Sequence, residues 1–180
     1  MAPTDMGPAV TDPQAYRENL FALVGDRDPF DVLSRTASLL DDLVRAHPSS
    51  VLRARPFEGK WTPLEIIGHL TDGEWVYGYR VRLVLSEDEP PILGTRQNAW
   101  VDRQRHNDRD PAELVGLFRT LRELNLAWTR RLSPTELTRV GRHNERGPES
   151  LATAIRMIAG HDLSHLHQID RYLDAIQQQS

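Results

Sequence analysis

The sequence predicts an all-α protein, a four-helix bundle, and three observations support this fold class. A motif typical of helix starts recurs along the chain. Apolar residues recur at three- and four-residue steps in four long segments. One connection, residues 87–110, is long and polar and contains Pro90, Pro91 and Gly94. Together these features predict four long helices with a crossover between the second and the third.

The helix-start motif places a side-chain oxygen at the cap, proline at the first helical position and an acidic residue two positions later. The oxygen accepts a backbone N–H, proline is preset for helical φ, and the acid meets the positive end of the helix dipole. Four copies occur, at Asp28-Pro29-Phe30-Asp31, Thr62-Pro63-Leu64-Glu65, Asp110-Pro111-Ala112-Glu113 and Ser133-Pro134-Thr135-Glu136.

Each of these four motifs opens or closely precedes a helical pattern. The long helices are expected at about 28–47, 62–86, 111–131 and 149–177. The first ends before Pro48, because proline cannot continue a helix. The crossover at 87–110 is longer than antiparallel neighbours need, whereas parallel helices require such a length. We therefore expect up-down-down-up order, and not simple alternation.

The remaining segments are short. Residues 1–27 are expected to form a partly ordered N-terminal arm, loose over 1–12 and with a short helix over 13–25. The bundle domain is expected to span 28–177. Residues 133–138 are expected to form a short turn of helix. A short extended stretch is expected, if anywhere, at residues 137–143.

Composition excludes several function classes. The chain has 180 residues, which fits one domain, and no cysteine, which excludes disulfides, thiolate ligands and a cysteine nucleophile. The net charge is −4 and the basic residues are scattered, so no nucleic-acid partner is expected. No apolar run approaches the roughly 18 residues of a membrane span. A cytoplasmic protein without a membrane partner is the expectation.

The last helix carries a pair of histidines, His161 and His165, one turn apart on one face. This face also holds core residues such as Ile158 and Ile169, and imidazoles buried there must be liganded or hydrogen-bonded. Such a pair is more often a chance arrangement or a satisfied core pair than a metal site. His69 on the second helix changes that balance, because bundles build metal sites from facing helices.

The other candidate residues are weaker. His47 precedes a proline at a helix end, and His106 and His143 are expected to be solvated in polar loops. Glu65 is interpreted as part of a capping box and not as a ligand. Asp162 and Gln168 are candidates to orient the ligating imidazoles, or are polar residues at the bundle edge.

Two motifs resemble those of the DinB-like superfamily, in its YfiT-type branch of metal-dependent hydrolases. They are Trp61-Thr62-Pro63-Leu64-Glu65-Ile66-Ile67-Gly68-His69-Leu70-Thr71-Asp72 and His161-Asp162-Leu163-Ser164-His165-Leu166-His167-Gln168-Ile169. The resemblance covers most of residues 28–176. It implies an up-down-down-up bundle, frequent homodimers, and one divalent metal ion held by His69, His161 and His165. Related proteins include transferases that use low-molecular-weight thiols.

Three imidazoles leave coordination positions open, which is typical of a catalytic site. We expect a metal-dependent hydrolase, or a low-molecular-weight-thiol S-transferase with the thiol as cosubstrate, acting on a small-molecule substrate. The metal can be Zn, Ni, Fe, Mn or Co. The alternatives are a noncatalytic, stress-related bundle with a structural ion, and histidines that pack without metal.

A catalytic site also needs a pocket above the metal. The loop at 87–110 is expected to form its wall, with Asn98 and Trp100 as candidates. For Trp100, a packing anchor beneath a long loop is the competing interpretation.

Overall fold

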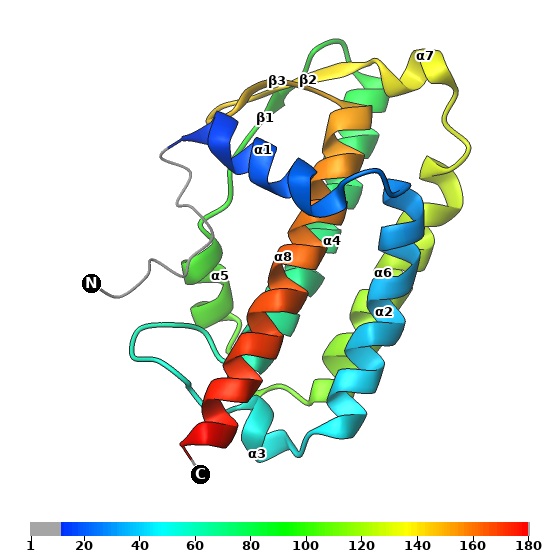
Figure 1. The fold of residues 1–180 in the computed structure, drawn as a ribbon. Helices are drawn as coiled ribbons and strands as arrows, with labels where there is room; N and C mark the ends of the chain where they lie inside the picture. The colour runs from blue at the N-terminus through cyan, green and yellow to red at the C-terminus, as the bar shows by residue number, and fades with distance from the viewer. Residues whose placement is uncertain (1–11, 180) are drawn as a thin grey trace.

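The computed structural model describes residues 12–179, and four long helices dominate it (Figure 1). They are α2 (Pro29–Ala46), α4 (Pro63–Ser86), α6 (Pro111–Thr129) and α8 (Leu151–Gln178). Both α2 and α4 pack against α6 and α8, so α2 and α4 occupy opposite corners of the bundle. In Figure 1, α2 and α8 run one way and α4 and α6 the other. The predicted four-helix bundle with up-down-down-up order is therefore confirmed.

The predicted helix starts are confirmed at the level of hydrogen bonds. Each of the four cap side chains accepts a backbone N–H of the first turn. At Thr62 the capping box is complete, because Glu65 Oε2 accepts the N–H of Thr62 at 2.7 Å. The motif at Ser133 opens only the single turn α7 (Pro134–Leu137), as predicted. The last turn of α2 is followed by α3 (Ser49–Leu52).

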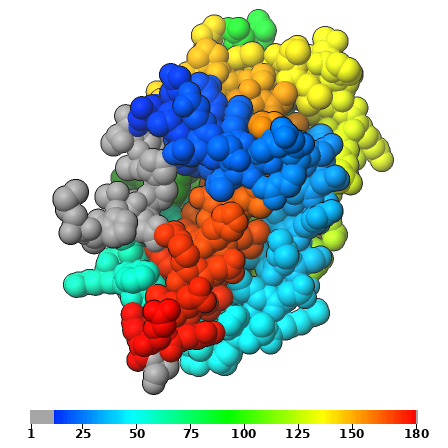
Figure 2. Space-filling view, in the orientation of Figure 1, coloured from blue at the N-terminus to red at the C-terminus, as the bar shows by residue number. Residues whose placement is uncertain are grey.

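The expected short helix near the N-terminus is α1 (Pro13–Val24), which lies across α8 (Figure 1, Figure 2). The contact is close because residue 160 is glycine: a Cβ at Gly160 would lie 2.4 Å from the carbonyl oxygen of Leu20. The backbone of α1 therefore rests directly beside the first histidine of α8. The loose stretch predicted for residues 1–12 lies, except for Asp12, outside the described residues.

A small three-stranded sheet stands beside the upper ends of α4 and α8 in Figure 1. Its order is β1 (Pro91–Ile92), β2 (Val140–His143), β3 (Gly147–Ser150), with β1 parallel and β3 antiparallel to β2. The sequence predicts an extended stretch only at β2. The other two strands are short: β1 forms because the distant β2 pairs with it, and β3 pairs with β2 across the short turn at 144–146. The crossover also contains α5 (Gln97–Arg103) and the 3-10 turn η1 (His106–Asp108).

Two apolar clusters fill the bundle. One, near α3, includes Leu64 and Phe118, and the other, near the sheet, includes Leu33 and Val81. None of the helices within residues 12–179 has both the length and the apolar character needed to cross a membrane.

A buried polar layer lies between the two clusters. Arg122 donates to Glu74 Oε1 at 2.8 Å, to the Leu33 carbonyl at 2.7 Å and to Asp162 Oδ2 at 2.7 Å. Thr36 donates to the same Asp162 oxygen at 2.7 Å. The layer thus joins all four long helices at the height of the histidine pair of α8.

Candidate metal centre

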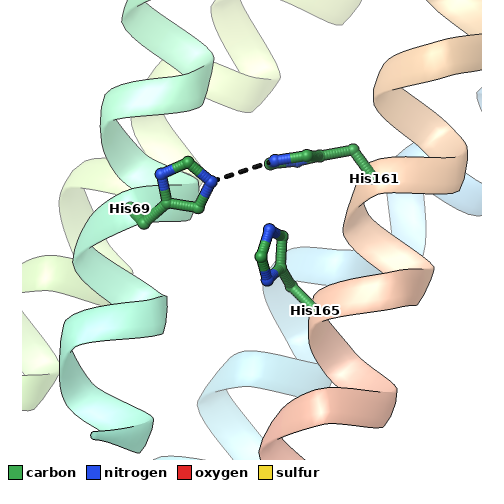
Figure 3. Close-up of side chains that lie close together, drawn as sticks. All are labelled: His69, His161 and His165. Atoms are coloured by element: carbon green, nitrogen blue, oxygen red, sulfur yellow. Dashed lines mark hydrogen bonds between the residues drawn. The ribbon is translucent and has the colours of Figure 1, made fainter. Parts of the chain in front are cut away.

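Three histidines from two helices converge in the bundle (Figure 3). His69 comes from α4, whereas His161 and His165 stand one turn apart on α8. One ring nitrogen from each lies within 4.8 Å of the others, and the Nε2 atoms of His69 and His161 are 3.0 Å apart. His69 is buried and the other two are partly exposed. We call these residues the histidine cluster.

The surroundings keep the histidine cluster uncharged. Burial lowers the pKa of His69 and of His161 well below 6.5, and their neighbouring histidines lower it further. Burial also lowers the pKa of His165, against the opposing effect of its hydrogen bond to Gln168. Neutral imidazoles have a free lone pair, so the cluster is ready to coordinate a cation at neutral pH.

One tautomer in the cluster follows from a hydrogen bond. His165 Nδ1 donates to Gln168 Oε1 at 2.8 Å, because an amide oxygen can only accept. Gln168 Nε2 in turn donates to Tyr172 Oη at 3.0 Å. These two hydrogen bonds fix the ring and leave Nε2 of His165 with a free lone pair that can bind a cation. The indole ring of Trp61 packs against His69, with the two ring centroids 4.8 Å apart.

The cluster fits a divalent ion. A single hydrogen bond can link His69 and His161, and the buried Nδ1 of His161 has no partner among the described residues. Coordination through Nε2 would use one lone pair of each ring and leave the proton on Nδ1, so the fit is judged at the Nε2 atoms. Two imidazole nitrogens that share an ion at about 2.0–2.1 Å lie about 3.0–3.4 Å apart. The observed 3.0 Å separation agrees with that arrangement.

Asp162, expected to orient an imidazole, lies in the buried polar layer. Its Oδ2 accepts from Thr36 and Arg122, and none of its hydrogen bonds within residues 12–179 reaches the histidine cluster. Among the described residues, Gln168 therefore hydrogen-bonds a histidine of the cluster, whereas Asp162 acts on His165 only through its charge, which raises the pKa of that imidazole.

A cavity of about 140 Å³ opens between α4 and α8 beside His69 and His161. Its walls are largely apolar, with Val76 and Ile158 among them. Trp100 from α5 lines the cavity and is 40% exposed, at its mouth. Asn98, the other predicted wall residue, is exposed and is not among the lining residues. The crossover thus contributes Trp100 to the cavity wall.

His106 is buried, so the prediction that it is solvated was wrong. Its ring fills the space left by Gly68, where a Cβ would lie 2.3 Å from His106 Cγ. His106 Nε2 donates to Asp72 Oδ2 at 2.8 Å, and Gln104 Nε2 donates to the same oxygen at 2.9 Å. Asp72 lines the cavity together with His69. Its place three residues after a candidate ligand is the signal that could have drawn attention to it.

His143 was also wrongly predicted to be solvated. It is 3% exposed, and burial lowers its pKa to about 4. The burial follows from strand pairing, because Ile92 of β1 lies opposite His143. The same end of the molecule adds three charged cavity residues that the sequence did not indicate, Arg80, Arg146 and Glu149.

Comparison with known proteins gives a consistent picture. The DinB superfamily model matches residues 33–169. A protein of Oceanobacillus iheyensis named "putative metal-dependent hydrolase" is 30% identical over 112 residues, 62% of this chain and 64% of that protein. YfiT of Bacillus subtilis, with the same description, is 29% identical over 98 residues, 54% of this chain and 53% of that protein. The chain thus matches less than two thirds of the length of these relatives.

The fold has a counterpart among solved structures. The structure of YfiT from Bacillus subtilis superimposes with a TM-score of 0.75, over 88% of this chain and 86% of that one, at 21% identity. YfiT is described as "a probable metal-dependent hydrolase with an unusual four-helix bundle topology". At this identity the likeness supports the fold.

Proposed function

The chain belongs to the DinB superfamily, and on that premise we propose that it is a metal-dependent hydrolase whose divalent ion is held by His69, His161 and His165. One observation carries the proposal: three neutral imidazoles from two helices converge beside a largely apolar cavity. Three protein ligands, two of them partly exposed, are typical of an open catalytic site and not of a closed structural one.

When bound, such an ion polarises a carbonyl and lowers the pKa of water towards about 7. The chain supplies the remaining parts. Gln168 holds the ring of His165 in one tautomer. The apolar cavity walls keep bulk water from the substrate, which strengthens electrostatic interactions inside.

Asp72 is the carboxylate we assign to proton transfer. The cavity contains one other carboxylate, Glu149, which is paired with Arg146 through both of its oxygens. Asp72 Oδ2 accepts from His106 and Gln104, so the group is held in place with its other oxygen available for a proton. A general base needs this combination of a fixed position and a free lone pair.

The test starts with metal content. Protein purified without a histidine tag is compared by elemental analysis with the double variant His69→Ala, His161→Ala. Equal metal content in the two would overturn the proposal. The loaded protein is then assayed against a panel of esters and amides before and after chelation. We expect turnover that is lost with the metal and restored by adding it back, while circular dichroism shows that helicity is retained.

Two further arms separate the alternatives. Asp72→Asn should retain the metal and lose hydrolysis, whereas a fully active variant would remove Asp72 from the mechanism. A parallel panel pairs low-molecular-weight thiols with electrophiles. Turnover in the thiol panel, with none in the ester and amide panel, would replace the hydrolase proposal by a thiol S-transferase. Collapse of the helices on chelation would instead favour a structural ion.

A further inference from the structure

The cavity carries charged side chains at its end beside the sheet. It contains Arg80 of α4, together with Arg146 and Glu149 of the sheet region. Glu149 accepts from Arg146 at 2.5 and 2.8 Å, so these two charges neutralise each other. Arg80 makes no ion pair within residues 12–179, and its one hydrogen bond is to the Leu93 carbonyl at 2.6 Å.

Arg80 therefore lies in the cavity wall without an ion-pair partner among the described residues. Burial, reinforced by the neighbouring Arg146, lowers the pKa of Arg80 to about 10, while the carboxylates of Glu149 and Glu145 act in the opposite direction. Four of the five guanidinium N–H donors of Arg80 have no protein acceptor among the described residues. Burying a cation without a partner is unfavourable, and such sites are commonly compensated by a ligand.

The geometry relates this end to the histidine cluster. His69 and Arg80 are eleven residues apart on α4, which is close to three full turns, so both lie on one face about 16 Å apart along the helix axis. Gly73 and Val76 lie between them on that face and line the same cavity. The cavity therefore has an imidazole end, an apolar middle and a guanidinium end.

From this polarity we infer that the substrate carries an oxyanion group, a carboxylate or a phosphate, which Arg80 binds while the reacting bond lies at the histidine cluster. Arginine suits this role because its planar fork binds such groups through two parallel hydrogen bonds. The inference rests on the proposed function in that it concerns the substrate of the same site. The oxyanion site itself belongs to Arg80 and does not need the metal.

The test uses matched probes on the metal-free and the metal-loaded protein. In the metal-free protein, isothermal titration compares hexanoate with hexanamide, which differ in the charge of one end. Because hydrogen bonds to charged groups are stronger, we expect hexanoate to bind about tenfold more tightly. Equal affinities would overturn the inference. Hexyl phosphate is the third probe, and whichever oxyanion binds more tightly identifies the group.

Variants locate the preference. Arg80→Gln should remove the preference for the charged probe, and Arg80→Lys should keep part of it, since the charge remains and the fork is lost. Arg131→Gln changes the net charge equally at an exposed position and should keep the full preference. A preference that survives Arg80→Gln would overturn the assignment to this residue.

The metal-loaded protein separates this inference from the proposed function. A six-carbon hydroxamate with a terminal carboxylate is compared with the same hydroxamate ending in a carboxamide. Hydroxamate binding that does not depend on the metal would count against the hydrolase proposal alone. Loss of the carboxylate preference, with metal-dependent binding intact, would count against the role of Arg80 alone.

Discussion

Replacing His165 by alanine should strip the protein of most of its metal while leaving the bundle folded. Zinc bound by four ligands in small domains contributes about 10–16 kcal/mol, so each ligand is worth about 3 kcal/mol. Removal of one imidazole should therefore weaken metal binding about 100-fold. Chelator competition, followed by elemental analysis of the tag-free protein, measures this loss.

The effect of the same change on stability is small and can be estimated from the contacts. Among the described residues, the side chain of His165 makes one hydrogen bond, to Gln168 Oε1, and loss of a bond of this kind costs about 1 kcal/mol. Gln168 still donates to Tyr172, so its amide nitrogen stays satisfied. For a chain of this size the Tm of the metal-free protein should fall by about 3 °C.

His167→Ala is the matched control. His167 is exposed, and two residues along α8 it points about 200° away from His165. This variant should keep the metal stoichiometry and affinity of the unaltered chain. If His165→Ala also kept them, His165 would not be a ligand and the assignment of the cluster would fail.

Three further predictions concern stability. Arg122→Ala should lower the free energy of unfolding by about 3–5 kcal/mol in urea titrations, because it leaves two buried carboxylates unpaired; an unchanged midpoint would contradict the role of the polar layer. Gly68→Ala should cost about 1–3 kcal/mol through its clash with His106, whereas Gly116→Ala, with open space around it, should stabilise α6 by about 0.5–1 kcal/mol. Acidification should lower the free energy of unfolding of the metal-free protein. The fold lowers the pKa of each histidine in the cluster, so the unfolded chain binds more protons than the folded chain. Stability therefore falls as the pH drops below about 6.5. Urea midpoints are measured at pH 7.5 and 5.5, with a variant lacking the three imidazoles as reference. The unaltered chain should lose more stability at pH 5.5 than this variant, and an equal or smaller loss would contradict the reasoning.

The parts of the fold that the sequence predicts are those encoded locally. A cap oxygen such as that of Thr62 acts within its own first turn, so the motif and the hydrogen bond coincide. The histidine pair of α8 has the same character, since its spacing places both rings on one face. The parallel order of α4 and α6 also followed from the sequence, because connection length limits topology.

The burial of His106 and His143 could not be read in this way. Their burial depends on residues far along the chain, His106 on the space above Gly68 and His143 on pairing with Ile92. The polar residues around each histidine in the sequence predicted that its side chain is solvated, whereas tertiary contacts exclude solvent from it. The charged end of the cavity was hidden for the same reason, since its members come from α4 and from a short hairpin.

The helix α1 has a consequence for how relatives can diverge. It lies outside the segment matched by the family model, yet Tyr16 and Leu20 line the cavity beside residues of α4 and α8. The histidine cluster and this part of the cavity wall are therefore encoded in separate stretches of the chain. Exchange of the segment before α2 could change which molecules enter the cavity without any change to the histidines, so selectivity can evolve faster here than the chemistry.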